Sequence, residues 1–362
     1  MEELSPGTIA AAGGLIAGIG MGFAARWGNF CTLGAIEVAI FGGNYDRIRM
    51  WALIIAVAML GTFFLDHLRL IDITQSIYLS AGTSLAAVAI GSVVFGLGMS
   101  LVGTCGFGAL VRIGGGDLKS IITFLVMGIF AYATLSGATA YLRLSLFSEQ
   151  DTGNNIAGIA HFTADYLSVS PNIIAYIIAF ALAYFALKTP GFRQQHKRIL
   201  ASILMGLLVV WGWLSTGVLA ADEFEPYRLE TLTFSAPLGE TIMYVMTMSG
   251  ASLKFGIGAT VGVIIGSALT SLALGHFRWE GCDDPRELKR QLVGGLLMGV
   301  GGVTALGCTI GQGISAFSTL AISAPIALIG MFCGAWVGLH FLIHGSISEA
   351  FQNLLATRQD DK

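Results

Sequence analysis

The fold is decided by two related stretches of sequence, GLGMSLVGTCGFGALVRIGGGDLKS at residues 96–120 and GVGGVTALGCTIGQGISAFSTLAIS at residues 299–323. At a constant offset of 203 residues they share three glycines, a cysteine and a serine. The matched positions are Gly96 and Gly299, Gly98 and Gly301, Cys105 and Cys308, Gly108 and Gly311, and Ser120 and Ser323. The shared cysteine favours a true internal repeat over a coincidence between glycine-rich segments.

The same register extends outward from both stretches. It pairs Gly91 with Gly294 and, with one inserted proline, the segment 29–34 (NFCTLG) with the segment 233–239 (TFSAPLG). In this second pair Ser235 stands where the first copy has Cys31. The sequence therefore predicts two repeated halves, approximately residues 8–142 and 198–345, within a single transmembrane domain.

The composition is that of a membrane protein. Of the 362 residues, 55% are hydrophobic and 11% are charged, and the mean hydropathy is +0.77. Because about 20 apolar residues form a helix that crosses the hydrocarbon core, this composition excludes a soluble protein and predicts an all-α polytopic membrane protein. Apolar runs predict nine spans, at residues 8–27, 50–66, 83–102, 119–142, 171–188, 198–219, 254–275, 291–306 and 324–345.

The repeat is predicted to be inverted. Its two copies follow the third and the eighth span, and since these spans are an odd number apart, the copies must cross the membrane in opposite directions. Inverted repeats are typical of transporters, in which the substrate binds near the midplane between broken helices. Four stretches that are too short, too glycine-rich or too polar to span are predicted to be re-entrant, at residues 28–40, 104–117, 230–248 and 308–322.

Basic residues predict the orientation, because lysine and arginine are retained on the cytoplasmic side. They cluster in the loops after the fifth and the seventh span, whereas the loop between these two carries five acidic residues against Arg228 alone. Alternation then places the N-terminus outside and the C-terminus in the cytoplasm. In this arrangement 15 lysines and arginines lie inside and 4 lie outside.

Three of the five cysteines, Cys31, Cys105 and Cys308, lie in predicted re-entrant segments among small residues. Glycine there lets backbone N–H groups turn toward an anion, or opens a helix N-terminus whose dipole favours one. A thiol is soft and weakly polar, so it suits a sulfur-containing substrate. Because no Cys-x-x-Cys pair occurs, no disulfide framework is expected. Cys282 and Cys333 are interpreted as packing residues.

Other polar residues near the thiols have two interpretations each. Arg112 and Lys119 either draw an anion into a cytoplasmic vestibule or serve as ordinary positive-inside anchors. Glu37 is the one acid of the first predicted re-entrant segment, and it is a functional candidate only if it lies at membrane depth. Gln312, four residues after Cys308, is a further polar candidate near this thiol. No metal or cofactor is expected.

These segments resemble the three cysteine motifs of the YeeE/YedE family, the thiosulfate transporters of bacterial inner membranes. The resemblance covers most of the chain and rests on Asn29-Phe30-Cys31, on Gly103-Thr104-Cys105-Gly106 and on residues 306–313 (LGCTIGQG). It implies nine transmembrane helices with short re-entrant helices in two inverted halves, and a central line of cysteines that passes thiosulfate by S–H contacts. The implied substrate-binding residues are Cys31, Cys105 and Cys308, with Asn29, Gly103, Thr104, Gly106, Gly108, Gly307, Thr309, Gly311, Gln312 and Gly313 around them.

The family also implies a location in the bacterial inner membrane and a small cytoplasmic sulfur-carrier protein as a partner. In the commoner family pattern basic residues often flank the first cysteine, whereas Trp27-Gly28-Asn29 stands here. Other family members are associated with different sulfur compounds or with selenium.

The leading hypothesis is a transporter, not an enzyme, that takes thiosulfate or a related small sulfur anion across the lipid bilayer into the cytoplasm. No nucleic-acid partner is expected. A dianion that enters against about 100 mV, inside negative, faces about 4.6 kcal/mol, so uptake needs ion coupling or consumption of the anion inside. The alternatives are a membrane thiol-disulfide oxidoreductase, a transporter of a selenium or other sulfur species, and a passive anion channel.

Overall fold

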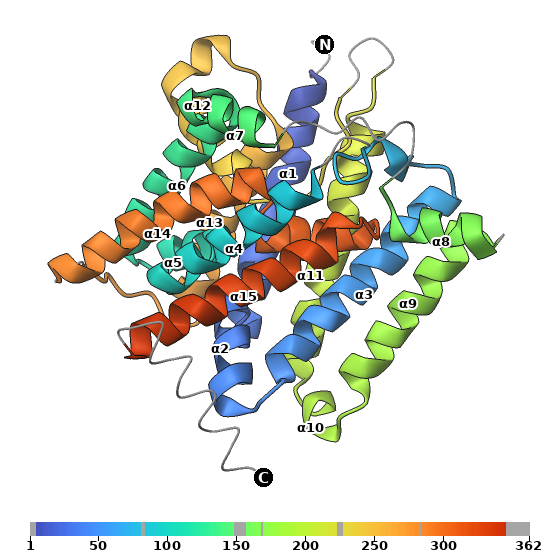
Figure 1. Ribbon diagram of the computed structural model, residues 1–362, viewed down its shortest axis with the longest axis horizontal. Coiled ribbons are helices and arrows are strands. Elements are labelled where there is room, and N and C mark those ends of the chain that lie inside the picture. The colour runs from blue at the N-terminus through green and yellow to red at the C-terminus, as the bar shows by residue number, and fades with distance from the viewer. Residues whose placement is uncertain are drawn as a thin grey trace.

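The protein, represented by a computed structural model, is all-helical over the residues that the structure describes, which are 5–80, 84–147, 157–167, 169–222, 227–281 and 284–344. In this part of the chain the only strand-like features are two isolated bridges, between Asp117 and Glu280 and between Gly158 and Ala321. Figure 1 shows the helices packed as one bundle. The α-helices are α1 (Pro6–Gly28), α2 (Thr32–Gly42), α3 (Asp46–His67), α4 (Leu85–Val102), α5 (Gly106–Gly114), α6 (Leu118–Ser136), α7 (Ala138–Leu146), α8 (Ile159–Leu167), α9 (Pro171–Leu187), α10 (Pro190–Arg193), α11 (His196–Leu214), α12 (Ala236–Thr247), α13 (Phe255–Ala273), α14 (Pro285–Thr304) and α15 (Ser323–His344).

A helix lies at each of the nine predicted spans. Seven helical stretches in the described part of the chain are long and apolar enough to cross a membrane. The two remaining helices are α9, which is shorter at 17 residues, and α14, whose first turns carry the charged run 286–290. The prediction of an all-helical, multi-pass membrane fold is thus confirmed, and the count of nine spans stays a prediction.

Short helices connect the long ones at the centre of the bundle. The 11-residue α2 and the 9-residue α5 follow directly on α1 and α4. A third such segment, residues 309–318, is helical and contains the π-helix η4 (Gly311–Ala316). The helix α5 and residues 309–318 fall within the stretches predicted to be re-entrant at 104–117 and 308–322, and α2 begins within 28–40 and extends two residues beyond it.

Glycine allows the long helices to approach closely. A Cβ on Gly18 of α1 would lie 2.2 Å from the Ala259 oxygen of α13, and a Cβ on Gly262 of α13 would lie 2.4 Å from the Leu15 oxygen of α1. Because membrane helices gain little from the hydrophobic effect when they associate, such backbone contact supplies much of their packing energy. The abundant glycines are therefore structural along most of the chain.

The helix contacts come in matched pairs. The helix α1 packs on α13 and α11 packs on α3, while α4 packs on α15 and α14 packs on α6. Across the contact between α4 and α14, a Cβ on Gly91 would meet the Gly301 oxygen at 2.9 Å, and a Cβ on Gly98 would meet the Gly294 oxygen at 2.6 Å. An offset of 203 residues converts the two contacts between α4 and α14 into one another and relates α4 on α15 to α14 on α6, whereas α1 and α11 correspond only in their order along the chain. This is the arrangement that a twofold relation between the halves requires.

Candidate functional site

Each of the three predicted site cysteines begins a new helical segment just after a long helix ends. The long helices α1, α4 and α14 are followed by residues with left-handed backbone conformation, at Asn29 (φ 53°), Gly103 (φ 82°) and Leu306 (φ 59°). In all three cases the cysteine comes two residues later. The left-handed residue stops the helix, and the chain then turns so that the cysteine starts the next segment.

The cysteine sulfur caps this new segment in the same way each time. The sulfur of Cys31 accepts a hydrogen bond from the Gly34 N–H at 3.4 Å, and Cys105 accepts from the Gly108 N–H at 3.4 Å. Cys308 accepts from the Gly311 N–H at 3.5 Å. The motif is therefore Cys-x-x-Gly at all three positions. It places each thiol at the positive end of a helical segment, where an anion is stabilised.

The three capped segments converge on Cys105. The Thr32 hydroxyl, next to Cys31, lies 3.7 Å from the Cys105 sulfur. On the other side the Thr309 hydroxyl, next to Cys308, interacts with the Cys105 thiol, and Cys105 and Cys308 lie within electrostatic range of one another. The chain thus brings together thiols that are as far as 277 residues apart in the sequence.

A row of aromatic rings holds the segments in place. The Phe30 and Phe107 rings are 6.2 Å apart, and the Phe107 and Phe234 rings are 5.2 Å apart. The backbone N–H of Phe234 then donates to the Cys308 sulfur at 3.2 Å. Cys308 therefore accepts hydrogen bonds from two backbone donors, Phe234 and Gly311.

The glycine of each motif makes room for a polar side chain beside the thiol. A Cβ on Gly34 would lie 2.2 Å from Nη1 of Arg47, and a Cβ on Gly108 would lie 2.1 Å from Oγ1 of Thr104. At Gly311 the nearest atom to such a Cβ would be Oγ1 of Thr233, at 2.4 Å, and the Tyr78 hydroxyl would lie at 3.3 Å. Each position that we call a thiol station thus combines a sulfur, a backbone donor and one hydroxyl or guanidinium group.

Access to the stations is unequal. Cys105 and Cys308 are 2% and 0% exposed, whereas Cys31 is half-buried. A cavity of about 520 Å³ is lined by Gly28 and Asn29 and by the basic residues His196, Lys197 and Arg198, together with Trp27, Gln194 and Gln195. This basic opening, at the end of the bundle that is predicted to be cytoplasmic, includes the turn residue Asn29 that lies two positions before Cys31.

With this geometry in place, the comparison with known proteins identifies the family. Residues 27–337 match the family described as Sulphur transport. The chain belongs to this family.

The similar proteins include two that are named thiosulfate transporter TsuA. The one from Spirochaeta thermophila is 28% identical over 336 residues, which cover 89% of this chain and 96% of that protein. The one from Escherichia coli is 24% identical over 341 residues, which cover 89% and 92%. The predicted membership of the YeeE/YedE family is thereby confirmed.

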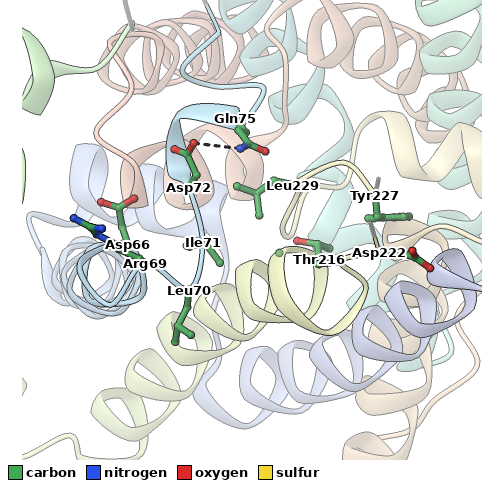
Figure 2. Close-up of a pocket in the computed structure, with 12 residues that line it drawn as sticks. Asp66, Arg69, Leu70, Ile71, Asp72, Gln75, Thr216, Asp222, Tyr227 and Leu229 are labelled. Carbon is green, nitrogen blue, oxygen red and sulfur yellow. Dashed lines mark hydrogen bonds between the residues drawn. The ribbon is translucent and has the colours of Figure 1, made fainter. Parts of the chain in front are cut away.

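A second cavity, of about 440 Å³, lies near the opposite end of this family member and contains none of the predicted site residues (Figure 2). It is lined by three aspartates, Asp66, Asp72 and Asp222, with Arg69 as the charged residue of opposite sign. The Asp72 carboxylate also accepts a hydrogen bond from the Gln75 amide at 3.2 Å. The negative charge of three carboxylates repels a dianion, so this cavity is unsuited to bind one.

Several predicted residues have structural partners. Arg112 donates to the Gly103 carbonyl at 2.8 Å, which braces the turn before Cys105, and Lys119 forms an ion pair with Glu287 at 2.9 Å. Gln312 donates to the Ala305 carbonyl at 2.8 Å and accepts from the Ser323 hydroxyl at 3.2 Å. These contacts favour scaffold functions for the three side chains, whose part in substrate binding stays a prediction.

Four further residues that the sequence analysis considered lie away from the hydrogen bonds of the stations. Glu37 is exposed on α2. The space beside Gly106 and Gly313 is occupied by neighbouring side chains. A Cβ on Gly106 would lie 2.8 Å from Met127, and a Cβ on Gly313 would lie 2.7 Å from Trp51. Cys333 is a free thiol on α15 and is exposed, whereas Cys105 and Cys308 are buried and Cys31 is half-buried. Cys282 lies outside the described residues.

Sequence reasoning missed four residues that lie at the stations. They are Thr32, Arg47, Tyr78 and Thr233. One signal was available for Thr32, because a Cys-Thr pair occurs at 31–32 and again at 308–309. Arg47 lies in the first turn of α3, whereas Tyr78 and Thr233 come from connecting segments, and no periodic pattern points to them.

Proposed function

We propose that this protein takes up thiosulfate, or a closely related sulfur oxyanion, through a path formed by Cys105, Cys308 and Cys31. The observation that carries the proposal is the convergence of three sulfur-capped helical segments at the centre of the bundle. Their N-terminal dipoles favour an anion, and their thiols are soft groups suited to a terminal sulfur. The names of the two relatives support the choice of thiosulfate.

The unequal access supports a direction. Cys105 and Cys308 are buried, whereas Cys31 is half-buried and follows Asn29, which lines the basic opening together with Lys197 and Arg198. An anion released from the central thiols would meet positive charge on this side. We therefore infer that Cys31 is the last thiol that the substrate contacts before the cytoplasm.

The architecture that we propose for this path is an inverted repeat with nine spans, with the N-terminus outside and the C-terminus in the cytoplasm of a bacterial cell. The paired helix contacts support the repeat, because α4 on α15 corresponds to α14 on α6 at the offset of 203 residues. The basic residues 188–198, in the turn around α10, support the orientation. The cytoplasmic consumer of the anion, for which a sulfur-carrier protein is the family's precedent, supplies the driving force that entry against the membrane potential requires.

The proposal is tested by growth on thiosulfate as sole sulfur source in a strain without other importers, and by uptake of ³⁵S-thiosulfate. The wild-type chain should restore both. Cys105→Ala, Cys308→Ala and Cys31→Ala should each abolish or greatly reduce uptake at normal protein levels, because alanine removes the thiol that contacts the desolvated anion, a loss of about 1 to 3 kcal/mol per contact.

Cys333→Ala is the matched control, since this thiol is exposed on α15 and should leave uptake unchanged. A Cys105→Ala, Cys308→Ala double variant with wild-type uptake would end the proposal of a thiol path. A wild-type chain that fails to take up thiosulfate would refute the proposed substrate itself.

A further inference from the structure

Two hydroxyl groups at the neighbouring Cys105 and Cys308 stations are buried without a hydrogen-bond partner of normal geometry. They belong to Thr233 and Thr309, and few other polar side-chain atoms in the described part of the chain share this condition. Thr309 is 1% exposed. Burial of an unpaired hydroxyl is unfavourable, so two of them at adjoining stations indicate that a ligand completes the site.

The surroundings of Thr309 show from which side its partner comes. On one side lies a cavity of about 340 Å³ between α2, α3, α9 and α15, where Thr32 and Thr309 provide the polar groups and the remaining lining residues are apolar. On the other side lies the Cys105 thiol, with which the Thr309 hydroxyl interacts. A polar partner for Thr309 therefore has to lie on the side of the thiols.

Thr233 is held against the same station from another segment. Its hydroxyl lies over the Cα atom of Gly311, where a Cβ would meet it at 2.4 Å, and the Tyr78 hydroxyl borders the same point. The next residue along the chain, Phe234, donates its N–H to the Cys308 sulfur. Thr233 thus lies at the Gly311 cap of Cys308, from the segment before α12, and the Thr309 hydroxyl lies on the Cys105 side of the same station.

We propose that Thr233 and Thr309 bind the oxygen atoms of the substrate while Cys308 contacts its terminal sulfur. This inference rests on the proposed function. A thiosulfate-like anion has two unlike ends, a soft sulfur atom and three hard oxygens, and a hydroxyl is the stronger donor to oxygen whereas a thiol is the softer group. The station would then recognise both ends at once. Its ligand class is a sulfonate with a terminal soft atom, and Tyr78 positions the Thr233 hydroxyl.

The test measures affinity separately from turnover, with Thr233→Val and Thr309→Val. Valine keeps the branched shape of threonine and removes only the hydroxyl. In each variant the Kd for ³⁵S-thiosulfate with purified protein, and the KM for uptake in vesicles, should rise about tenfold. The maximal uptake rate should fall much less, and Thr233→Ser and Thr309→Ser should restore affinity.

Thr260→Val is the matched control. Thr260 is also a fully buried threonine, but its hydroxyl donates to the Gly256 carbonyl of its own helix at 2.9 Å, so its loss should leave Kd and KM unchanged. Unchanged Kd and KM in both station variants would overturn the inference and leave the hydroxyls to bound water. Equal losses in the serine and valine variants would overturn it as well, because a purely structural effect would then explain them.

The two proposals fail in different ways. If the wild-type chain neither binds nor takes up thiosulfate, the proposed function is wrong. If the wild-type chain does both and the valine variants match it, only the assignment of the two hydroxyls is wrong.

Discussion

The starts of α2 and α12 occupy matching positions in the predicted repeat, yet only one of them forms a thiol station. In both, a phenylalanine that packs on Phe107 comes first, Phe30 before Cys31 and Phe234 before Ser235. Cys31 is extended (φ −152°, ψ 123°) and caps α2 through Gly34. Ser235 has φ −109° and ψ −70°, makes no side-chain cap, and is followed by Pro237 within the first turn.

This difference shows what a station requires. Serine is an excellent helix cap, so the missing cap does not follow from the change of cysteine to serine. Instead the start of α12 lacks the glycine three residues on, where Leu238 stands, and the inserted proline removes one backbone donor. The Phe234 N–H is directed at Cys308. The α12 segment therefore completes the third station and does not form a fourth.

The largest effect is expected when the glycine of the Cys-x-x-Gly motif is replaced by alanine. In Gly108→Ala the new Cβ would lie 2.1 Å from Oγ1 of Thr104, and in Gly311→Ala it would lie 2.4 Å from Oγ1 of Thr233. Each clash displaces the polar group or the thiol cap, and overpacking of this kind costs about 1 to 3 kcal/mol. We expect ³⁵S-thiosulfate uptake to fall by about tenfold or more in both variants.

Gly191→Ala is the matched control, because no heavy atom lies within 4 Å of the Cβ it would add. Its uptake should equal that of the wild type. Normal uptake in Gly108→Ala and Gly311→Ala would mean that the polar groups over these glycines take no part in transport.

The serine series compares the stations with one another. Cys31→Ser should retain the most uptake, because Cys31 is half-buried and serine preserves the helix cap. Cys105→Ser and Cys308→Ser should retain the least, since a shorter and harder hydroxyl replaces a soft thiol where Cys105 and Cys308 are fully buried. Initial uptake rates normalised to protein level decide the order. The reverse order would show that Cys31 is the more demanding station.

A smaller effect is expected at the charge beside Cys31. Arg47 lies over Gly34, so Arg47→Gln would remove a positive charge from the half-buried station. We expect the KM for thiosulfate to rise about two- to fivefold, in line with a partly exposed charge contact, and the rise should shrink at high salt. Arg49→Gln is the control, since Arg49 instead donates to the Phe185 carbonyl at 2.8 Å.

Much of the fold follows from the sequence because bilayer thickness fixes helix length. Most long apolar runs became helices within a few residues of their predicted bounds, for example Pro171–Leu187 against the predicted 171–188. The predicted span 119–142 is instead divided at Gly137 into α6 and α7, and α14 begins at Pro285, before the predicted residue 291. Two of the short segments were also identifiable, because glycine and cysteine at an offset of 203 residues mark them in both copies. Cys105 and Cys308 came from that pattern, whereas Cys31, whose counterpart is Ser235, came from its short glycine-flanked segment and from the resemblance to the family.

The polar residues around those thiols could not be predicted. Tyr78 and Thr233 reach the Gly311 position from connections between helices, and such connections carry no periodicity that would show which way a side chain points. Arg112 and Gln312 were candidates by proximity in sequence, but their hydrogen bonds to backbone carbonyls depend on how the chain turns. The conformation of the chain where α4 and α14 end determines which carbonyls these side chains reach, and sequence spacing alone does not show it.

The last contrast between the two segments concerns a partly buried acid. The connection that leads into α12 contains Glu230, whereas residues 29–31 before α2 contain no carboxyl. Tyr227 donates to this carboxylate at 2.8 Å, yet burial is the larger influence and raises the pKa of Glu230 above its ordinary value of 4.5. Between that value and the raised pKa the folded protein binds more protons than the unfolded chain, so stability must fall as the pH rises through this window.

Glu230→Gln keeps an oxygen that accepts from Tyr227 and removes the ionisation. The unfolding temperature of the detergent-solubilised variant should therefore decline less than that of the wild type as the pH is raised above about 4.5, and Glu37→Gln, at an exposed acid, should follow the wild type. Superimposable pH profiles for wild type and Glu230→Gln would show that ionisation of Glu230 carries no penalty in the fold.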